Sequence, residues 1–215
     1  MSKRPALLYL HGFLSSPASQ KATELRSLLS DIKPDIELVV PTLSLEPDSA
    51  FGTALEQART LGDRLCGVVG SSLGGYYAAA LSQEVGCRAV LVNPAVYPYR
   101  LLADYLGPQA NPYTGETCTL ESRHLTALER LDPGPLGTPE RLLLILQTGD
   151  ETLNYHQALD RYPDSPAWIQ PGGDHRFQDF DRVIPAILAF LGVACHPRAI
   201  GYTARKSIRE GSRHE

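Results

Sequence analysis

The most constraining feature of this 215-residue chain is a G-x-S-x-G motif, Gly70-Ser71-Ser72-Leu73-Gly74. Residues 65–69 before it are mostly apolar and predict a buried strand, while residues 75–82 after it predict a helix rich in small side chains. A strand, a sharp turn and a helix in this order form the setting in which such a motif presents a nucleophile. The motif therefore predicts a serine exposed at the end of a strand.

The glycine spacing selects Ser72 rather than Ser71 as the reactive hydroxyl. Where a helix turns back so close to a strand, only small residues fit two positions before and after the serine. For Ser72 these positions hold Gly70 and Gly74, whereas for Ser71 they hold bulky apolar residues. The N–H of Leu73 would then lie at a helix N-terminus, where it can bind a developing oxyanion.

Strand-like and helix-like segments alternate through the first half of the chain. The order β-α-β-α-β-α-β predicts a mostly parallel sheet with helices on both faces. Two later apolar runs bring the expected number of strands to about six. The predicted strands cover residues 5–10, 36–40, 65–69, 88–92, 141–147 and 166–170.

The first predicted strand ends at His11-Gly12-Phe13. Because glycine permits close backbone approach, the N–H of Phe13 is the candidate for a second oxyanion donor. We interpret His11 as a structural histidine that hydrogen-bonds this loop, in preference to a catalytic base. Since functional sites of parallel sheets form at the carboxyl ends of strands, this loop and Ser72 are expected on one edge.

An acid and a histidine follow the last two predicted strands. Asp150 is favoured over Glu151 as the acid because it comes directly after a glycine in a turn; the alternative is that Asp150 caps the helix expected at 154–161. His175 lies in a glycine-rich loop, where a general base would sit. His156, in that expected helix, and His196 and His214, near the C-terminal end, have less suitable positions.

The order Ser72, Asp150, His175 is the order of the α/β-hydrolase fold. We therefore predict the α/β class and this fold, with His175 as the base that activates Ser72 and Asp150 orienting His175. The predicted reaction is attack of Ser72 on an acyl carbonyl, followed by hydrolysis of the acyl-enzyme. Two alternatives remain, an acyltransferase with the same triad and a non-catalytic binding protein with this fold.

Residues 1–195 are expected to form one domain, with an insertion at 94–139 and a mobile basic tail at 196–215. The insertion is rich in proline and tyrosine and breaks the alternation of strands and helices, with short helices expected near 101–106 and 121–131. We interpret it as a cap that shapes an acyl pocket, and the alternative is a packing excursion without substrate contact. His124, within it, is expected to cap or pack.

The last predicted helix contains a proline. Pro185 removes a backbone donor and clashes with the preceding turn, so the regular helix is expected to begin near Ile184. The apolar positions at helical spacing are Phe180, Val183, Ile184, Ile187, Leu188 and Leu191.

Composition excludes several other classes of function. The net charge of −4 offers no basic surface for nucleic acid, and no apolar run is long enough to span a membrane. No P-loop or dinucleotide-binding glycine pattern is present, and His175 with Asp174 lacks a further metal ligand. We see no signal peptide, and the four cysteines are scattered, which favours a reducing, cytoplasmic location. Neither metal nor cofactor is expected.

Several motifs together resemble the bacterial YqiA esterase family. They are Leu8-Tyr9-Leu10-His11-Gly12-Phe13, Gly70-Ser71-Ser72-Leu73-Gly74-Gly75-Tyr76-Tyr77, Val92-Asn93-Pro94-Ala95, Asn111-Pro112-Tyr113-Thr114-Gly115 and Gln147-Thr148-Gly149-Asp150-Glu151. The resemblance extends to about Gly192. It implies a small cytoplasmic carboxylesterase without a cofactor, acting on short-chain esters or acyl thioesters, with its triad at Ser72, Asp150 and His175.

Overall fold

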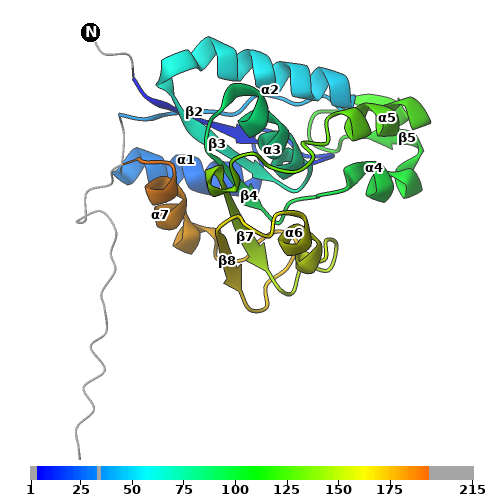
Figure 1. The fold of residues 1–215 in the computed structure, drawn as a ribbon. Coiled ribbons are helices and arrows are strands. Elements are labelled where there is room, and N and C mark those ends of the chain that lie inside the picture. The colour runs from blue at the N-terminus through cyan, green and yellow to red at the C-terminus, as the bar shows by residue number, and fades with distance from the viewer. Residues whose placement is uncertain (1–3, 33–34, 194–215) are drawn as a thin grey trace, which may run out of the picture.

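The computed structural model describes residues 4–32 and 35–193 and is built on a six-stranded sheet flanked by helices (Figure 1). The strands lie in the order β2-β1-β3-β4-β7-β8, and their pairings are all parallel. This confirms the predicted fold class, while the tail expected at 196–215 lies outside the described residues. The strands are β1 (Ala6–Leu10), β2 (Glu37–Val39), β3 (Leu65–Ser71), β4 (Ala89–Val92), β7 (Leu142–Gln147) and β8 (Ala167–Gln170).

The strand order places a crevice between the ends of β1 and β3. From β1 the chain crosses to β2 on one side, then returns past β1 to β3 and continues to β4 on the other side. Connections that leave in opposite directions open a crevice at the carboxyl ends of the two central strands. The loop after β1 and the G-x-S-x-G turn after β3 both lie at this point.

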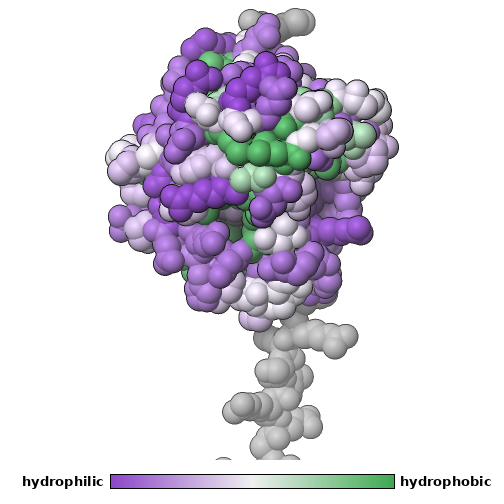
Figure 2. Space-filling view, turned by 90° about the vertical axis from the view of Figure 1, so that its right-hand side faces the viewer, coloured by the Kyte–Doolittle hydropathy of each residue, from purple (hydrophilic) through white to green (hydrophobic). Residues whose placement is uncertain are grey.

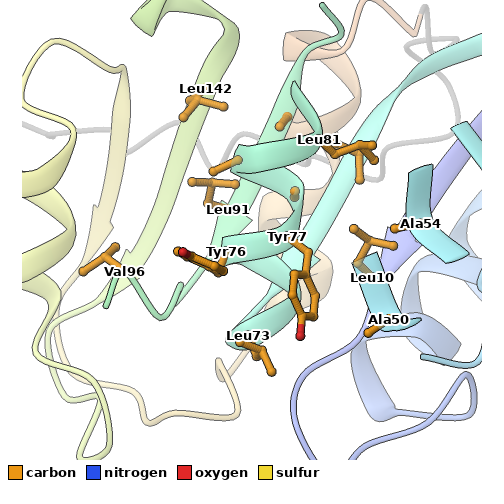
Figure 3. Close-up of a cluster of buried hydrophobic side chains, with 14 of the residues drawn as sticks. Leu10, Ala50, Ala54, Leu73, Tyr76, Tyr77, Leu81, Leu91, Val96 and Leu142 are labelled. Atoms are coloured by element: carbon orange, nitrogen blue, oxygen red, sulfur yellow. The ribbon is translucent and has the colours of Figure 1, made fainter. Parts of the chain in front are cut away.

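Helices cover both faces of the sheet, as predicted, because alternate strand residues are apolar on both sides. In β1, Leu7 and Tyr9 pack with α1 (Gln20–Ile32) and α7 (Phe180–Phe190). Leu8 and Leu10 pack on the opposite face, with α2 (Pro47–Leu61) and α3 (Leu73–Val85) (Figure 3). Within the described ranges, no helix is long and apolar enough to cross a membrane.

Helix α7 begins four residues earlier than expected, at Phe180, and contains Pro185 in its interior. The expected start near Ile184 was therefore wrong. Pro185 cannot donate to the carbonyl group four residues earlier, but that carbonyl belongs to Asp181, which is exposed in the first turn and can bond water. Burial of Phe180 and Val183 against the sheet offsets the lost hydrogen bond.

The segment 94–139 folds into short elements at the carboxyl edge of the sheet (Figure 1). The helix expected at 121–131 is α5, whereas 101–106 holds mainly a 3-10 turn. An antiparallel hairpin between them was not foreseen. The elements are α4 (Pro98–Leu101), η2 (Leu102–Tyr105), β5 (Gly107–Ala110), β6 (Thr117–Leu120) and α5 (Ser122–Arg130); η3 (Pro139–Arg141) begins at the last residue of the segment, and η1 (Gly62–Arg64) and α6 (Tyr155–Arg161) lie outside it.

Buried polar contacts fix this segment to the rest of the fold. The Tyr76 hydroxyl on α3 donates to the Leu128 carbonyl on α5 at 2.6 Å. The Asn111 amide donates to the Ser15 carbonyl at 2.7 Å, which joins the hairpin to the loop after β1. These contacts place the segment directly beside the crevice between β1 and β3.

Helix α3 packs so closely against the sheet that side chains are excluded at two positions. A Cβ atom on Gly70 would lie 2.1 Å from the Gly74 carbonyl oxygen. A Cβ atom on Gly74 would lie 2.1 Å from the carbonyl oxygen of Leu10, at the end of β1. The two motif glycines are therefore required by contacts with backbone atoms that cannot move aside.

Replacing Gly74 with alanine tests this packing. Since the new methyl group meets backbone, we expect Gly74→Ala to lower the free energy of unfolding by about 2–3 kcal/mol in chemical denaturation. The matched control is Gly52→Ala within α2, where a Cβ atom meets nothing within 4 Å. This variant should gain about 0.5–1 kcal/mol. Equal stability of the two variants would contradict the packing described.

Candidate active site

Ser72 occupies a strained turn between β3 and α3. Its backbone has φ 56° and ψ −122°, values that residues other than glycine rarely adopt. Hydrogen bonds hold the turn on both sides: its N–H donates to the Val92 carbonyl at 3.1 Å, and its carbonyl accepts from Gly75 at 2.9 Å and Ala95 at 3.1 Å. The surrounding structure thus maintains a conformation that would otherwise relax.

Asp150 lies in the turn after β7, with only 2% of its side chain exposed. Its Oδ1 atom accepts from the N–H groups of Thr152 at 2.9 Å and Leu153 at 2.8 Å, which locks the carboxylate in place. Helix α6 is capped instead by Asn154, whose side chain accepts from the His156 N–H at 3.0 Å. The alternative interpretation of Asp150 as the helix cap is therefore wrong.

The loop after β8 brings His175 between the other two side chains. Its Nδ1 atom lies 2.9 Å from Asp150 Oδ2 and 3.1 Å from Oδ1, and its Nε2 atom lies 3.1 Å from Ser72 Oγ. Because a carboxylate only accepts, Nδ1 carries the proton and Nε2 offers its lone pair to the serine hydroxyl. Glu151, the other acid considered, accepts instead from the His175 backbone N–H at 2.9 Å.

Two buried amides that sequence reasoning missed hold the His175 loop. Gln147, fully buried at the end of β7, accepts through Oε1 from the N–H groups of Asp174 (3.1 Å) and Gln178 (2.9 Å), and donates through Nε2 to the Gln178 carbonyl (2.8 Å). Asn93 donates to the Asp174 carbonyl at 3.1 Å and accepts from the Gln147 N–H at 3.0 Å. The sequence did hold a signal for them, since an amide residue at the end of a run of apolar strand residues indicates a buried polar group with hydrogen-bond partners.

The other described histidines have structural positions. His11 is 3% exposed; its Nδ1 faces the Gly12 carbonyl at 3.0 Å and its Nε2 accepts from the Leu43 N–H at 3.1 Å. Burial lowers its pKa, so it stays neutral, and the structural interpretation of His11 is confirmed. His156 stacks on Tyr155 at the surface, while His196 and His214 lie outside the described residues.

His124 belongs to a group of potential metal ligands that does not fit a metal site. Donor atoms of Glu46, Cys118 and His124 lie within 4.8 Å of one another. However, His124 Nδ1 accepts from the Glu121 N–H at 3.0 Å, so its neutral ring carries the proton on Nε2. Burial also raises the pKa of the Cys118 thiol. His124 therefore caps α5, as expected.

Two cavities meet at Ser72. The larger, here the polar cavity, has a volume of about 420 Å³, and its lining includes Tyr9, Ser19, Lys21, Ser71, His175 and Arg176. The smaller, here the apolar pocket, has a volume of about 200 Å³, and its lining includes Phe13, Leu73, Ala95, Leu101, Leu102 and Tyr105. Figure 2 shows the side of the molecule on which α4 and α5 lie, with apolar residues gathered in its upper half among hydrophilic ones.

Removing the Gln147 amide should loosen the His175 loop. In Gln147→Leu, two N–H groups and one carbonyl lose their partner, so we expect a loss of about 2–4 kcal/mol in stability. We also expect faster hydrogen–deuterium exchange at residues 174–178, measured by mass spectrometry. Gln170 is the control, because it pairs with Gln147 in the sheet register and is half-buried. Unchanged exchange in Gln147→Leu, or an equal effect of Gln170→Leu, would contradict this role.

Solved structures of low sequence identity share this fold. Est1E from Butyrivibrio proteoclasticus, solved with ferulic acid, aligns with TM-score 0.63 and 14% identity over 88% of each chain. The α/β-hydrolase domain-containing protein 10 from mouse aligns with TM-score 0.65 and 18% identity, over 89% of this chain and 91% of its own. An esterase from Pyrococcus furiosus aligns with TM-score 0.61 and 17% identity, over 89% and 82% respectively.

A family model described as "Uncharacterised protein family (UPF0227)" matches residues 6–192, which include Ser72, Asp150 and His175. The match spans the whole sheet, the segment 94–139 and the helices on both faces. Together with the structural similarities, it shows that the chain has the α/β-hydrolase fold and belongs to the UPF0227 family, the YqiA family.

Proposed function

We propose that this protein is a serine esterase that hydrolyses small acyl esters or thioesters through an acyl-enzyme. The observation that carries the proposal is the continuous hydrogen-bonded chain from Ser72 through His175 to the buried Asp150. A serine hydroxyl becomes an effective nucleophile when a positioned base removes its proton, and the base needs a partner that fixes its tautomer. The positions of His175 and Asp150 agree with both requirements, at a serine that lines both cavities.

In the first half of the proposed reaction, Ser72 Oγ attacks the acyl carbonyl carbon while His175 Nε2 takes the hydroxyl proton. Asp150 stabilises the imidazolium that forms. His175 then gives the proton to the leaving alcohol or thiol as the bond to the acyl carbon breaks. In the second half, His175 takes a proton from water, which attacks the acyl-enzyme, and returns that proton to Ser72.

The proposed oxyanion donors are the backbone N–H groups of Leu73 and Phe13. Leu73 is the first residue of α3, so the helix makes no use of its N–H, and the helix dipole favours negative charge there. Phe13 follows Gly12, where an added Cβ atom would lie 3.2 Å from Ser72 Cβ. This close approach supports the placement of the Phe13 N–H beside the reacting carbonyl.

Further features agree with the proposal. The Pyrococcus furiosus protein of this fold is described as an esterase, and Est1E was solved with ferulic acid bound. The segment 94–139 supplies Ala95, Leu101, Leu102 and Tyr105 to the apolar pocket, which supports its proposed role as a cap. Cys66, Cys87 and Cys118 are free thiols, as a proposed cytoplasmic location would require. The mechanism needs neither metal nor cofactor.

A fluorophosphonate probe tests the nucleophile directly. We expect labelling of the wild type, located on Ser72 by peptide mass spectrometry, and no labelling of Ser72→Ala. Hydrolysis of 4-nitrophenyl acetate should fall by about 10³-fold or more in that variant. Ser71→Ala should still be labelled at Ser72. Labelling at another residue, or none on the folded wild type, would overturn the proposal.

The same ester assay separates the two neighbouring acids. Asp150→Asn should lower kcat by about 10⁴-fold, because an amide in contact with Nδ1 favours the wrong tautomer. Glu151→Gln keeps an oxygen that can accept from the His175 N–H, so its loss should stay within about tenfold. Similar losses in the two variants would show that Asp150 has no special role.

A further inference from the structure

The polar cavity has a charge that the proposed chemistry does not use. Among the described residues that line it, two are cations, Lys21 and Arg176, and none is an aspartate or glutamate. Ser72 and His175 line the same cavity. Ester hydrolysis by the triad needs no cation at this place, so the charge points to recognition of a ligand.

Lys21, at the start of α1, is set into the wall of this cavity. Its Nζ atom donates to the Arg176 carbonyl oxygen at 2.7 Å, and an ammonium group has two further hydrogens to donate. Within the described part of the chain, no carboxylate lies within ion-pair distance of Nζ. The ammonium group thus has hydrogens to offer to a ligand in the cavity.

The nearby acids already have other partners. Asp150 is bonded to His175 and to two backbone N–H groups. Asp174 Oδ2 accepts from the Gln178 amide at 3.0 Å, while its buried Oδ1 has no hydrogen-bond partner; Glu24 accepts from Gln20 at 2.7 Å. None of the three lines the polar cavity. An anion that entered the cavity would therefore meet no carboxylate in its lining, but two cations and several hydroxyl groups, beside the apolar side chains of Phe13 and Leu14.

The hydroxyl groups of the cavity complete a site suited to oxyanions. Tyr9, Ser19 and Ser71 line it, and burial raises the pKa of Tyr9, which keeps its phenol protonated and able to donate. Charge-assisted hydrogen bonds from an ammonium group to carboxylate or phosphate oxygens are among the strongest in proteins. Apolar side chains, by contrast, dominate the apolar pocket, which shares Ser72 and His175 with this cavity.

We propose that the substrate is an ester with one apolar part and one part that ends in a carboxylate or phosphate, bound by Lys21 and Arg176 in the polar cavity. This inference rests on the proposed esterase function and narrows its substrate class. The apolar part occupies the apolar pocket, so the scissile carbonyl lies between the two at Ser72. Lys21 is a specificity-determining residue in this account and takes no part in bond breaking.

The charge of Lys21 is sensitive to pH in a useful range. The pKa of Lys21 is lowered to about 8, mainly by burial and to a smaller extent by Arg176, while Glu24, Asp174 and Asp150 act in the opposite direction. The amine is therefore mostly charged at neutral pH and loses its charge as the pH rises through about 8. The preference for anionic over neutral esters should fall across the same pH range. An anion bound beside Nζ favours the charged amine, so it shifts the midpoint of this fall to higher pH.

The test compares kcat/KM for matched anionic and neutral esters. On the acyl side the pair is 4-nitrophenyl hydrogen succinate and 4-nitrophenyl pentanoate. On the leaving-group side, 4-acetoxybenzoate and 4-acetoxyphenyl phosphate are compared with 4-methylphenyl acetate. We expect the wild type to prefer the anionic ester of at least one side by about tenfold or more. Comparison of 4-acetoxybenzoate with 4-acetoxyphenyl phosphate distinguishes a carboxylate from a phosphate. If the anionic ester is preferred on only one side, that side is the part of the substrate that occupies the polar cavity.

Lys21→Met retains the length of the side chain without its charge. We expect it to reduce the anionic-to-neutral ratio by about tenfold or more, through KM. Folding is checked by thermal unfolding; because burial of the ammonium group opposes its charge, Met at this position should not lower Tm. Arg26→Gln, an exposed cation on the same helix, removes equal charge and should leave the ratio unchanged.

No anionic preference on either side, or an equal change of the ratio in Lys21→Met and Arg26→Gln, would overturn this inference. Hydrolysis of the neutral esters by the wild type would then still support the proposed esterase. Calorimetric titration of Ser72→Ala with 4-hydroxybenzoate and with 4-methylphenol measures anion binding without any hydrolysis, so it tests the anion site independently of the esterase proposal. Tighter binding of the anion, lost in Ser72→Ala with Lys21→Met, would support the anion site even if the esterase proposal failed.

Discussion

The close approach of α3 to β1 and β3 is the constraint on which the site depends. Because Gly70 and Gly74 have no Cβ atom, the N-terminus of the helix can come into contact with the end of β1. That approach places Ser72 between the loop that contains Gly12 and the start of α3. Hydrogen bonds to neighbouring strands and loops maintain the strained backbone of Ser72. The free energy of this strain is therefore offset by the packed sheet and not by the turn alone.

The loop that carries His175 depends on hydrogen bonds from two buried amide side chains. The loop after β8 has little secondary structure of its own, and its N–H and carbonyl groups would otherwise need water. Gln147 and Asn93 satisfy them from the ends of β7 and β4. The same two strands precede the turns that carry Asp150 and Ala95. Parallel strands that end at one edge therefore supply both the side chains of the proposed triad and the groups that position them.

The sequence allowed prediction of the sheet, the strand order along the chain and the residues that meet at the edge, since these depend on apolar runs and glycine spacing. It did not predict the hairpin of β5 and β6, whose short strands contain Gly107 and Pro108 and lack a clear alternation. Pro185 led to a wrong prediction of where α7 begins, because the burial of apolar side chains against the sheet outweighed the local cost of a proline in the helix. The positions of Gln147 and Lys21 depend on contacts distant in sequence; a lysine on an amphipathic helix ordinarily indicates a solvated face.

The central claim is that one sheet edge assembles a nucleophile, its base and an oxyanion site. A crystal structure of the protein after reaction with a small phosphonate ester would test it most directly. The account predicts phosphorus bonded to Ser72 Oγ and a phosphonyl oxygen about 2.7–3.1 Å from the backbone nitrogens of Phe13 and Leu73. His175 should remain bonded to Asp150. An adduct on another residue, or an oxygen directed away from both nitrogens, would contradict the account.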